Sequence, residues 1–291
     1  MAREEFTVGI IGLGLMGGSA ALKLKEERFA GKILGYDIDQ DHAREALALK
    51  IVDEVLVLDE LCYQSDLLIL AIPVNKALLV LPEVMAKINP YSIVIDLGST
   101  KQRICKLANT LQNRGQFVAC HPIAGTENTG PKAAFASLFQ DKVNIICDKE
   151  NSTTGALALI TRMSETLGMR VKYMDSASHD RHIAYVSHLS HITSFMLGKT
   201  VLEVENDEAN IFDMAGSGFA STVRLAKSSP EMWAPIFKEN SDNILIVLDR
   251  YINNLNKMRD LIEQGDEEDL TQTMKDINII RSVLDGEQVT R

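Results

Sequence analysis

The sequence lacks most features of proteins that are secreted, cross a membrane or depend on a metal. It has only four cysteines, and no two of them show the C-x-x-C spacing of zinc and redox sites; they stand at positions 62, 105, 120 and 147. We therefore expect reduced thiols that fill core space in a cytoplasmic protein, and no metal site. No run of about 18 apolar residues occurs, so no membrane span is expected.

Positive charge is scarce as well. The 30 Lys and Arg residues stand against 40 Asp and Glu residues, which gives a formal net charge of −10 at pH 7. An acidic chain of this kind disfavours non-specific binding to nucleic acid or to an anionic membrane. An anionic substrate would therefore need a local cationic pocket. The segment Met1–Glu5 contains acids and no apolar core, so we expect no signal peptide.

What the sequence does contain is an alternation of short apolar runs and helical patterns over its first 175 residues. Strands are expected at 6–11, 33–37, 66–72, 92–97, 116–120, 142–147 and 170–174. Helices are expected at 18–28, 41–49, 76–87, 101–113 and 153–167. Short, wholly apolar strands with helices between them predict an α/β doubly wound domain, in which both faces of a parallel sheet are covered.

A glycine motif stands at the start of this pattern. The strand 6–11 leads directly into glycines at 12, 14 and 17, the G-x-G-x-x-G arrangement of a dinucleotide-binding turn. Gly12 permits the tight turn, Gly14 lets a pyrophosphate approach the backbone, and Gly17 lets helix and strand pack closely. Asp37 follows the second strand, 20 residues after Gly17, where an acid can accept a hydrogen bond from an adenine ribose. These residues predict a Rossmann-type domain.

The cofactor is predicted to be NAD rather than NADP. A carboxylate at Asp37 would repel a 2′-phosphate, and no arginine follows it until Arg44. The third strand ends in Ile72-Pro73, an apolar edge against which a nicotinamide can lie. The predicted cofactor-binding residues are Gly12, Gly14, Leu15, Met16, Gly17, Asp37, Ile72 and Pro73.

The pattern changes after Asp175. No convincing strand follows, and helices are expected at 178–205, 207–214, 217–227, 230–264 and 266–284. We predict a Rossmann domain over residues 1–175 and an all-α domain over residues 176–291. The stretch Ile244 to Ile262 places apolar residues on one broad helix face. We expect that face to be buried in a homodimer, with packing inside its own domain as the alternative.

Polar side chains follow two of the predicted strands, at the sheet edge where ligands of open α/β sheets bind. His121 follows the fifth strand, and a neutral imidazole there can take a proton from a substrate hydroxyl while a hydride leaves the same carbon. A structural histidine at a strand end is the alternative. Ser99 and Glu127 lie in the neighbouring loops and can orient the ring or the substrate. The alternative for each is a solvated loop residue or a helix cap.

The first helix of the second half has a polar stripe. Asp180, Ala184, Ser187 and His191 lie at offsets 0, 4, 7 and 11, which is one face of a helix. A metal site built from Asp180, His188 and His191 is the rival interpretation, but no further ligand cluster accompanies these residues. Lys76 and Lys101 are expected to be solvated, with a place near phosphate or substrate as the alternative for Lys101.

Several of these motifs together resemble the prephenate/arogenate dehydrogenase family of tyrosine biosynthesis. The similarity covers G-L-G-L-M-G-G-S at 12–19, D-L-G-S-T-K at 96–101, H-P-I-A-G-T-E at 121–127, S-H-L-S-H at 187–191 and R-L-A-K-S-S-P-E-M-W at 224–233. The resemblance implies a Rossmann domain followed by a helical dimerisation domain, with the active site in the cleft between them. We expect neither a fused chorismate mutase nor a further regulatory domain.

The resemblance also implies roles for single residues. His121 matches the catalytic histidine that hydrogen-bonds the ring C4 hydroxyl, and Ser99 matches the serine beside it. Five residues match groups around the substrate: Arg224 and His191 at its carboxylate, Glu127 at the pocket mouth, Asp180 as an acid lining the cleft, and Trp233 as an aromatic lent by a partner subunit. Position 190 is Ser where relatives often have Pro, which can change the approach of His191.

The reaction implied is the NAD-dependent oxidative decarboxylation of prephenate, a small dianion, to 4-hydroxyphenylpyruvate. Three alternatives remain open. Arogenate carries an amino group in place of the keto group, which an acid such as Asp180 or Glu127 would bind. A β-hydroxyacid dehydrogenase has a similar domain plan but relies on a helical lysine, and none stands out in 178–200. A nucleotide-sensing protein without activity would not explain polar groups at several strand ends.

Overall fold

The computed structural model describes residues 6–205 and 211–284 of the chain. The chain divides into two compact units, Met1–Asn243 and Ile244–Arg291. All residues predicted to form the site belong to the first unit.

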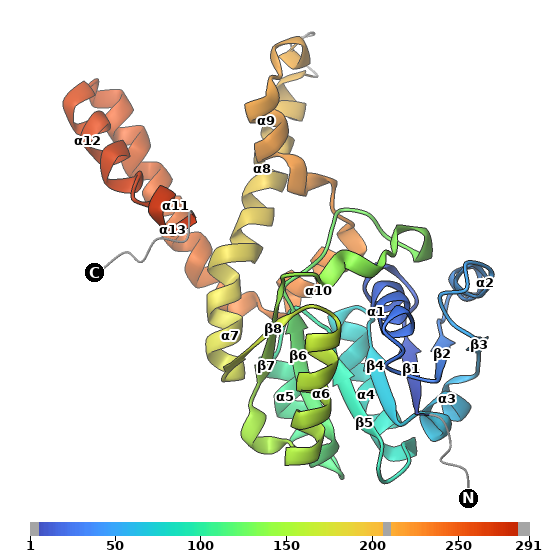
Figure 1. The fold of residues 1–291 in the computed structure, drawn as a ribbon. Helices are drawn as coiled ribbons and strands as arrows, with labels where there is room; N and C mark the ends of the chain where they lie inside the picture. Colours follow the sequence, from blue (N-terminus) through green and yellow to red (C-terminus); the bar gives the residue numbers. More distant parts are fainter. Residues whose placement is uncertain (1–5, 206–210, 285–291) are drawn as a thin grey trace, which may run out of the picture. The chain divides into compact units, whose positions relative to one another are not determined.

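Eight strands of the described residues form one sheet in the order β3-β2-β1-β4-β5-β6-β7-β8 (Figure 1). Neighbouring strands are parallel except for β6 and β7, which are antiparallel. The strands are β1 Thr7–Ile11, β2 Lys32–Tyr36, β3 Glu54–Val55, β4 Leu67–Leu70, β5 Ile93–Asp96, β6 Phe117–Pro122, β7 Val143–Cys147 and β8 Arg170–Met174. The predicted doubly wound α/β class is confirmed.

Apolar residues cover both faces of this sheet, as strand β4 illustrates. Leu67 and Ile69 belong to one buried cluster, and Leu68 and Leu70 belong to another on the opposite face. The alternation follows from the two-residue period of a strand. Helices α1 and α6 contribute to the first cluster and helices α3, α4 and α5 to the second, so the strand ends are held between two helical layers.

The helices of this part are α1 Leu15–Glu26, α2 Gln40–Ala48, α3 Leu58–Gln64, α4 Val74–Lys87, α5 Gln102–Ala108 and α6 Thr154–Thr166. Four details differ from the sequence predictions. Helix α1 begins directly after Gly14 rather than at residue 18, and α5 ends at Ala108 rather than at residue 113. Strand β3 and helix α3 were not predicted, because each is short and carries no clear hydrophobic period.

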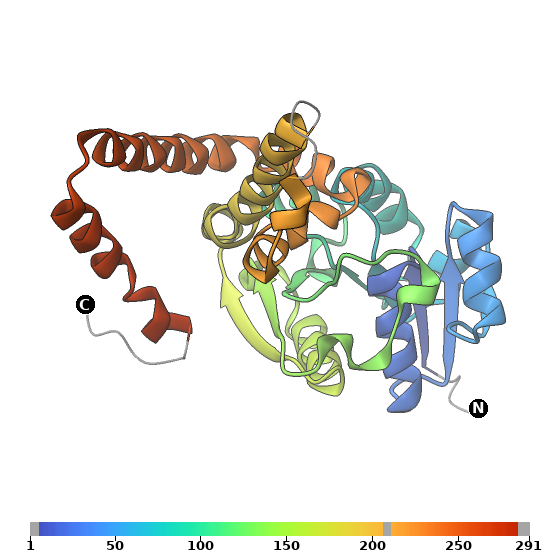
Figure 2. The same ribbon diagram turned by 90° about the horizontal axis from the view of Figure 1, so that it is seen from above.

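The predicted helix 178–205 is one continuous helical segment (Figure 1 and Figure 2), and its pitch changes inside it. Helix α7 spans Ser176–Ile183, a π-helical turn spans Ala184–His188, and α8 spans Leu189–Glu205. A π turn adds a residue to the helical repeat, so side chains after it are rotated from the positions that a regular α-helix gives them.

The next part of the chain is more broken than predicted. A 3-10 turn spans Ile211–Met214, and residues 207–210 of the helix predicted there lie outside the described residues. Helix α9 covers Ser217–Thr222 and is followed by a 3-10 turn, Arg224–Lys227, instead of one helix over 217–227. The single helix predicted over 230–264 is wrong, since α10 Pro230–Glu239 and α11 Ser241–Gln264 are separated by Asn240.

Helix α11 continues into the second unit, followed by α12 Glu267–Ile277 and α13 Ile280–Leu284. Gly265 separates α11 from α12 with a φ of 68°, a value that favours glycine. Ile244 and Val247 at the start of α11 are buried, whereas Ile252, Leu255 and Ile262 are exposed. No helix among the described residues is both long and apolar enough to cross a lipid bilayer.

Candidate active site

The glycine turn has the geometry that its three glycines require. Gly12 has a φ of 97°, and a Cβ there would lie 2.5 Å from the carbonyl oxygen of Ala71. A Cβ on Gly17 would lie 2.0 Å from the carbonyl oxygen of Gly12, so helix α1 packs against the turn only because this residue has no side chain. A Cβ on Gly14 would meet no atom within 4 Å, which leaves open space over the backbone at this point.

Asp37 joins this turn to the end of strand β2. Its carboxylate accepts hydrogen bonds from the backbone N–H of Leu13 at 2.8 Å and of Asp39 at 2.9 Å. The side chain of Ile72 packs against Gly12 on the other side, with Pro73 exposed beyond it at the start of α4. Leu15 and Met16 form the first turn of α1, where unpaired N–H groups and the helix dipole favour a phosphate.

His121 lies at the end of β6, and only 8% of its surface is exposed. Its Nδ1 atom lies 2.8 Å from Nε2 of His179, which is a hydrogen-bond distance. The pKa of His121 lies well below its usual value, chiefly because of burial, and the neighbouring His179 and the Lys101 cation act in the same direction. The imidazole is therefore neutral near pH 7 and offers a lone pair to a proton.

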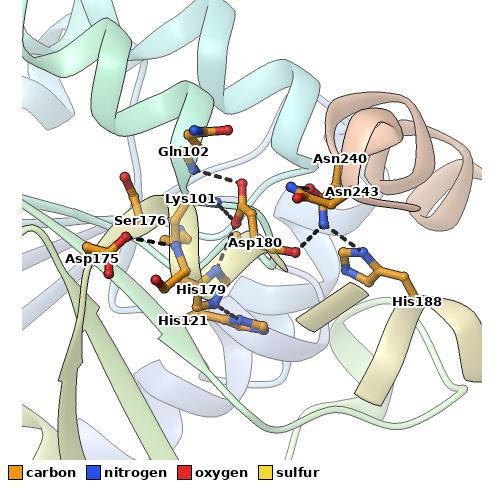
Figure 3. A network of polar contacts seen from close by, with 12 residues as sticks. Lys101, Gln102, His121, Asp175, Ser176, His179, Asp180, His188, Asn240 and Asn243 are labelled. Atoms are coloured by element: carbon orange, nitrogen blue, oxygen red, sulfur yellow. Dashed lines mark hydrogen bonds and ion pairs between the residues drawn. The ribbon is translucent and has the colours of Figure 1, made fainter. Parts of the chain in front are cut away.

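The contact continues from His179 to Asp180 (Figure 3). Nδ1 of His179 lies 2.8 Å from Oδ1 of Asp180. The Asp180 carboxylate also accepts hydrogen bonds from two backbone N–H groups where α5 begins, from Lys101 at 2.7 Å and from Gln102 at 2.8 Å. An acceptor at this position is favoured by the unpaired N–H groups of a helix start. A chain of contacts thus runs from the ring of His121 to α5.

This placement corrects one prediction and adds a residue. Asp180 was expected to line the active site as a substrate-binding acid, but it is only 1% exposed and both carboxylate oxygens accept N–H groups of the protein. His179 was not among the predicted site residues, although it is the side chain that contacts His121. Its sequence signal is its place directly before Asp180, on the predicted helix that carries the polar stripe.

Lys101 was expected to be solvated, and this was wrong. Its side chain is fully buried and forms an ion pair with Asp96, the last residue of β5. Burial disfavours the charged form of Lys101, but the Asp96 carboxylate outweighs this and raises its pKa. The pair holds the loop Leu97–Thr100, in which Ser99 lies half-buried. No hydrogen bond joins Ser99 to His121 in the described part of the chain.

His191 and Trp233 form a second group. Their rings are stacked, with centroids 3.4 Å apart and planes 23° apart. Nδ1 of His191 donates to the carbonyl oxygen of Ser187 at 3.0 Å, which leaves Nε2 as the free acceptor of the neutral ring. Burial lowers the pKa of His191. Trp233 was expected to be lent to a partner subunit; within this chain it is buried against His191 and Phe237.

Arg224 and Glu127 form a third group, a partly exposed ion pair. The guanidinium lies 3.7 Å from the Glu127 carboxylate, and 56% of the Arg224 side chain is exposed. Arg224 opens a 3-10 turn rather than lying inside the helix predicted over 217–227. An exposed ion pair of this kind contributes about 0–1 kcal/mol to stability, so the fold does not depend on it.

His188 completes the network from the side of α10. It is fully buried, and Asn240 donates hydrogen bonds to its Nδ1 at 3.1 Å and to the carbonyl oxygen of Asp180 at 2.7 Å. Burial lowers the pKa of His188 to about 4. The Asp180 carboxylate is hydrogen-bonded to two backbone N–H groups and to His179. No cluster of three or more metal-ligating side chains occurs in residues 6–205 and 211–284.

Comparison with known proteins identifies relatives over both halves of the chain. A family model described as "Prephenate dehydrogenase, nucleotide-binding domain" matches residues 20–173. A second one, "Prephenate dehydrogenase, dimerization domain", matches residues 175–276.

Individual relatives agree with these matches. The chain is 32% identical to a prephenate dehydrogenase of Bacillus subtilis, over 94% of this chain and 75% of that one. It is 33% identical to a cyclohexadienyl dehydrogenase of Zymomonas mobilis, over 95% of each. The crystal structure of a prephenate dehydrogenase from Aquifex aeolicus, in complex with hydroxyphenyl propionate and NAD+, has a TM-score of 0.88 and 32% identity, with 98% of this chain and 100% of that chain covered.

Proposed function

The chain belongs to the prephenate dehydrogenase family, and we propose that it catalyses the NAD-dependent oxidative decarboxylation of prephenate to 4-hydroxyphenylpyruvate, a step of tyrosine biosynthesis. The observation that carries the proposal is the state of His121. A buried, neutral imidazole at the carboxyl end of β6, on the same sheet edge as the glycine turn, is the base that oxidation of a hydroxyl requires.

The residues at the glycine turn fit NAD. Gly14 leaves open space for the pyrophosphate, and the first turn of α1, with Leu15 and Met16, offers its N–H groups. Asp37 can accept a hydrogen bond from the 2′-hydroxyl of the adenine ribose and would repel the 2′-phosphate of NADP. Ile72 and Pro73 provide the apolar surface for the nicotinamide. When bound, NAD accepts the hydride that leaves ring C4 of the substrate.

His121 handles the proton in this reaction. As the C4 hydroxyl of prephenate becomes a carbonyl, its O–H bond breaks and the proton moves to Nε2 of His121. Loss of the ring carboxylate as CO2 then sends an electron pair through the ring to the same oxygen. That oxygen takes a proton to become the phenol. Prephenate and NAD+ are converted to 4-hydroxyphenylpyruvate, CO2 and NADH without net release of a proton, so His121 can return the one it received.

Substrate recognition is proposed for four of the predicted site residues, Arg224, His191, Ser99 and Glu127. Arg224 offers a planar pair of donors that suits a carboxylate, and His191, fixed by its stack on Trp233, offers a polar group next to it. Ser99 is proposed to bind the C4 hydroxyl, and Glu127 to set the position of Arg224. Arogenate would require a carboxylate near its amino group that has no other partner. The Asp180 carboxylate accepts hydrogen bonds from two backbone N–H groups, and the Glu127 carboxylate is paired with Arg224. This supports prephenate.

We also propose a homodimer and the division of the chain at residue 175. The second family match carries the description "dimerization domain" and begins at residue 175. The exposed apolar residues Ile252, Leu255 and Ile262 of α11 are suited to burial against a second copy. The mass in solution at micromolar concentration tests this: a dimer is expected, and a monomer would contradict it.

Steady-state rates with prephenate and with arogenate, each with NAD and with NADP, test the proposed function. The pair of prephenate and NAD is expected to give the highest kcat/KM, with CO2 and NADH formed in equal amounts. A higher kcat/KM with arogenate than with prephenate would mean that arogenate is the substrate. NADH formation without CO2 would mean that the reaction is not an oxidative decarboxylation. The His121→Asn protein, prepared in the same way, supplies the background rate.

A further inference from the structure

The contacts of His121 determine more than its position, because they decide which of its two nitrogens carries the proton. A neutral imidazole has one N–H donor and one acceptor, and the partner of one nitrogen fixes the state of the other. Only an Nε2 without a proton can act as a base toward a substrate, since Nδ1 is occupied by His179.

The carboxylate at the far end of the chain of contacts sets the direction of every hydrogen bond in it. Asp180 can only accept, so Nδ1 of His179 must carry the proton that it donates across 2.8 Å. With that one proton on its ring, His179 has its lone pair on Nε2, and it accepts from Nδ1–H of His121 across 2.8 Å. His121 is left with its lone pair on Nε2, which makes no hydrogen bond within the described residues.

Resting on the proposed function, we propose that His179 is a positioning residue: it holds His121 in the Nδ1–H tautomer, with Asp180 as the anchor that orients His179. The two backbone N–H groups at the start of α5 hold the carboxylate in place at 2.7 and 2.8 Å, and Figure 3 shows this line of contacts. The three side chains, His121, His179 and Asp180, form what we call the histidine relay.

The relay also serves the step in which His121 carries an extra proton. When Nε2 receives the substrate proton, the ring becomes a cation that still donates from Nδ1 to His179. His179 in turn donates to a carboxylate, so negative charge is aligned with the cation through two hydrogen bonds. His179 touches neither substrate nor cofactor in this account. Its effect on the rate passes through His121 alone.

The tautomer can be read directly in the wild-type protein. Long-range 1H–15N spectra of 15N-histidine-labelled protein distinguish a protonated Nδ1 from a protonated Nε2, and the His121 signal is assigned by its loss in His121→Asn. The relay predicts a proton on Nδ1 of His121 and none on Nε2 near pH 7. A His121 ring protonated on Nε2 would overturn the proposal, whatever the variants do.

Kinetics give the second test. His179→Ala is expected to lower kcat for prephenate by about 10- to 100-fold and to abolish the single tautomer of His121, with little change in KM for NAD. The same substitution at His182, which is exposed on the same helix α7, is the matched control and is expected to leave kcat unchanged. A His179→Ala protein with normal kcat would contradict the relay.

A double variant separates a role through His121 from a general structural role. Because His179 acts through His121, His121→Asn/His179→Ala is expected to be no slower than His121→Asn alone. Multiplied losses would show that His179 acts independently, against the proposal. Failure of the relay and of the proposed function are distinguishable: a wild type that shows the Nδ1–H tautomer but does not oxidise prephenate refutes only the function. A wild type that oxidises prephenate while His121 carries its proton on Nε2 refutes only the relay.

Discussion

The guanidinium of Arg224 lies 3.7 Å from the carboxylate of Glu127, and more than half of the Arg224 side chain is exposed. If Arg224 binds a substrate carboxylate, Arg224→Ala should raise KM for prephenate by roughly 10- to 100-fold, since a hydrogen bond to a charged group contributes about 1.5–3 kcal/mol. KM for NAD should not change. Arg224→Lys should restore little, because a point charge cannot make the paired contact.

Glu127→Gln is the control for Arg224, because it removes the charge of its partner and keeps its size. We expect a smaller rise in KM for prephenate with Glu127→Gln than with Arg224→Ala. An equal rise in KM in the two variants would mean that the ion pair itself matters. A large fall in melting temperature for Arg224→Ala would mean that Arg224 supports the fold.

Cofactor choice should follow Asp37. Asp37→Ser combined with Ile38→Arg removes the carboxylate and supplies a cation at a position where the side chain is 86% exposed. The ratio of kcat/KM for NADP to that for NAD should rise by about tenfold or more, as expected for a charged hydrogen bond to a 2′-phosphate. Ile38→Arg alone should change the ratio less. A wild type that already uses both cofactors equally would refute this role of Asp37.

The buried His188 should make the protein less stable in mild acid. Its pKa is about 4 in the folded protein against an ordinary value of 6.5, so the unfolded chain binds more protons between these pH values and stability falls as pH falls. The difference corresponds to about 3 kcal/mol. His188→Gln should therefore show a shallower loss of melting temperature from pH 7 to pH 4. His182→Gln, exposed on α7, should keep the wild-type slope; identical slopes in both variants would contradict the assignment.

We expect Lys101 to stabilise the folded protein. Lys101→Met leaves the Asp96 carboxylate buried without its partner, which should lower the free energy of unfolding by about 3–5 kcal/mol. Lys76→Met, at an exposed position, should change it by no more than about 0.5 kcal/mol. Denaturant unfolding of the two variants measures both values, and similar small changes would show that the Asp96–Lys101 pair does not stabilise the fold.

The part of the fold that could be predicted is the part in which sequence neighbours decide the structure. Strand β4 is apolar at every position because both its faces are covered, and the glycines at 12, 14 and 17 are demanded by the turn they form. Such signals are local. The elements that were missed or merged, such as α3 and the break at Asn240, depend on packing against distant parts of the chain.

The polar network could not be predicted for the same reason. Asp180 binds backbone groups 78 and 79 residues away, so its role emerges only when α7 is known to pack at the start of α5. The burial of Lys101 depends on a turn that brings it back to Asp96. The face proposed for Asp180 and His191 assumed a regular α-helix, and the π turn Ala184–His188 changes the direction in which His191 points.

The most direct test of the account is the rate of the His121→Asn protein with prephenate and NAD, measured together with its dissociation constant for NAD. We predict a kcat lowered by about 100-fold or more, as expected for loss of a general base, and an unchanged dissociation constant, because the glycine turn is a separate part of the site. A kcat near that of the wild type, with NAD bound normally, would contradict the central claim that His121 takes the proton from the substrate.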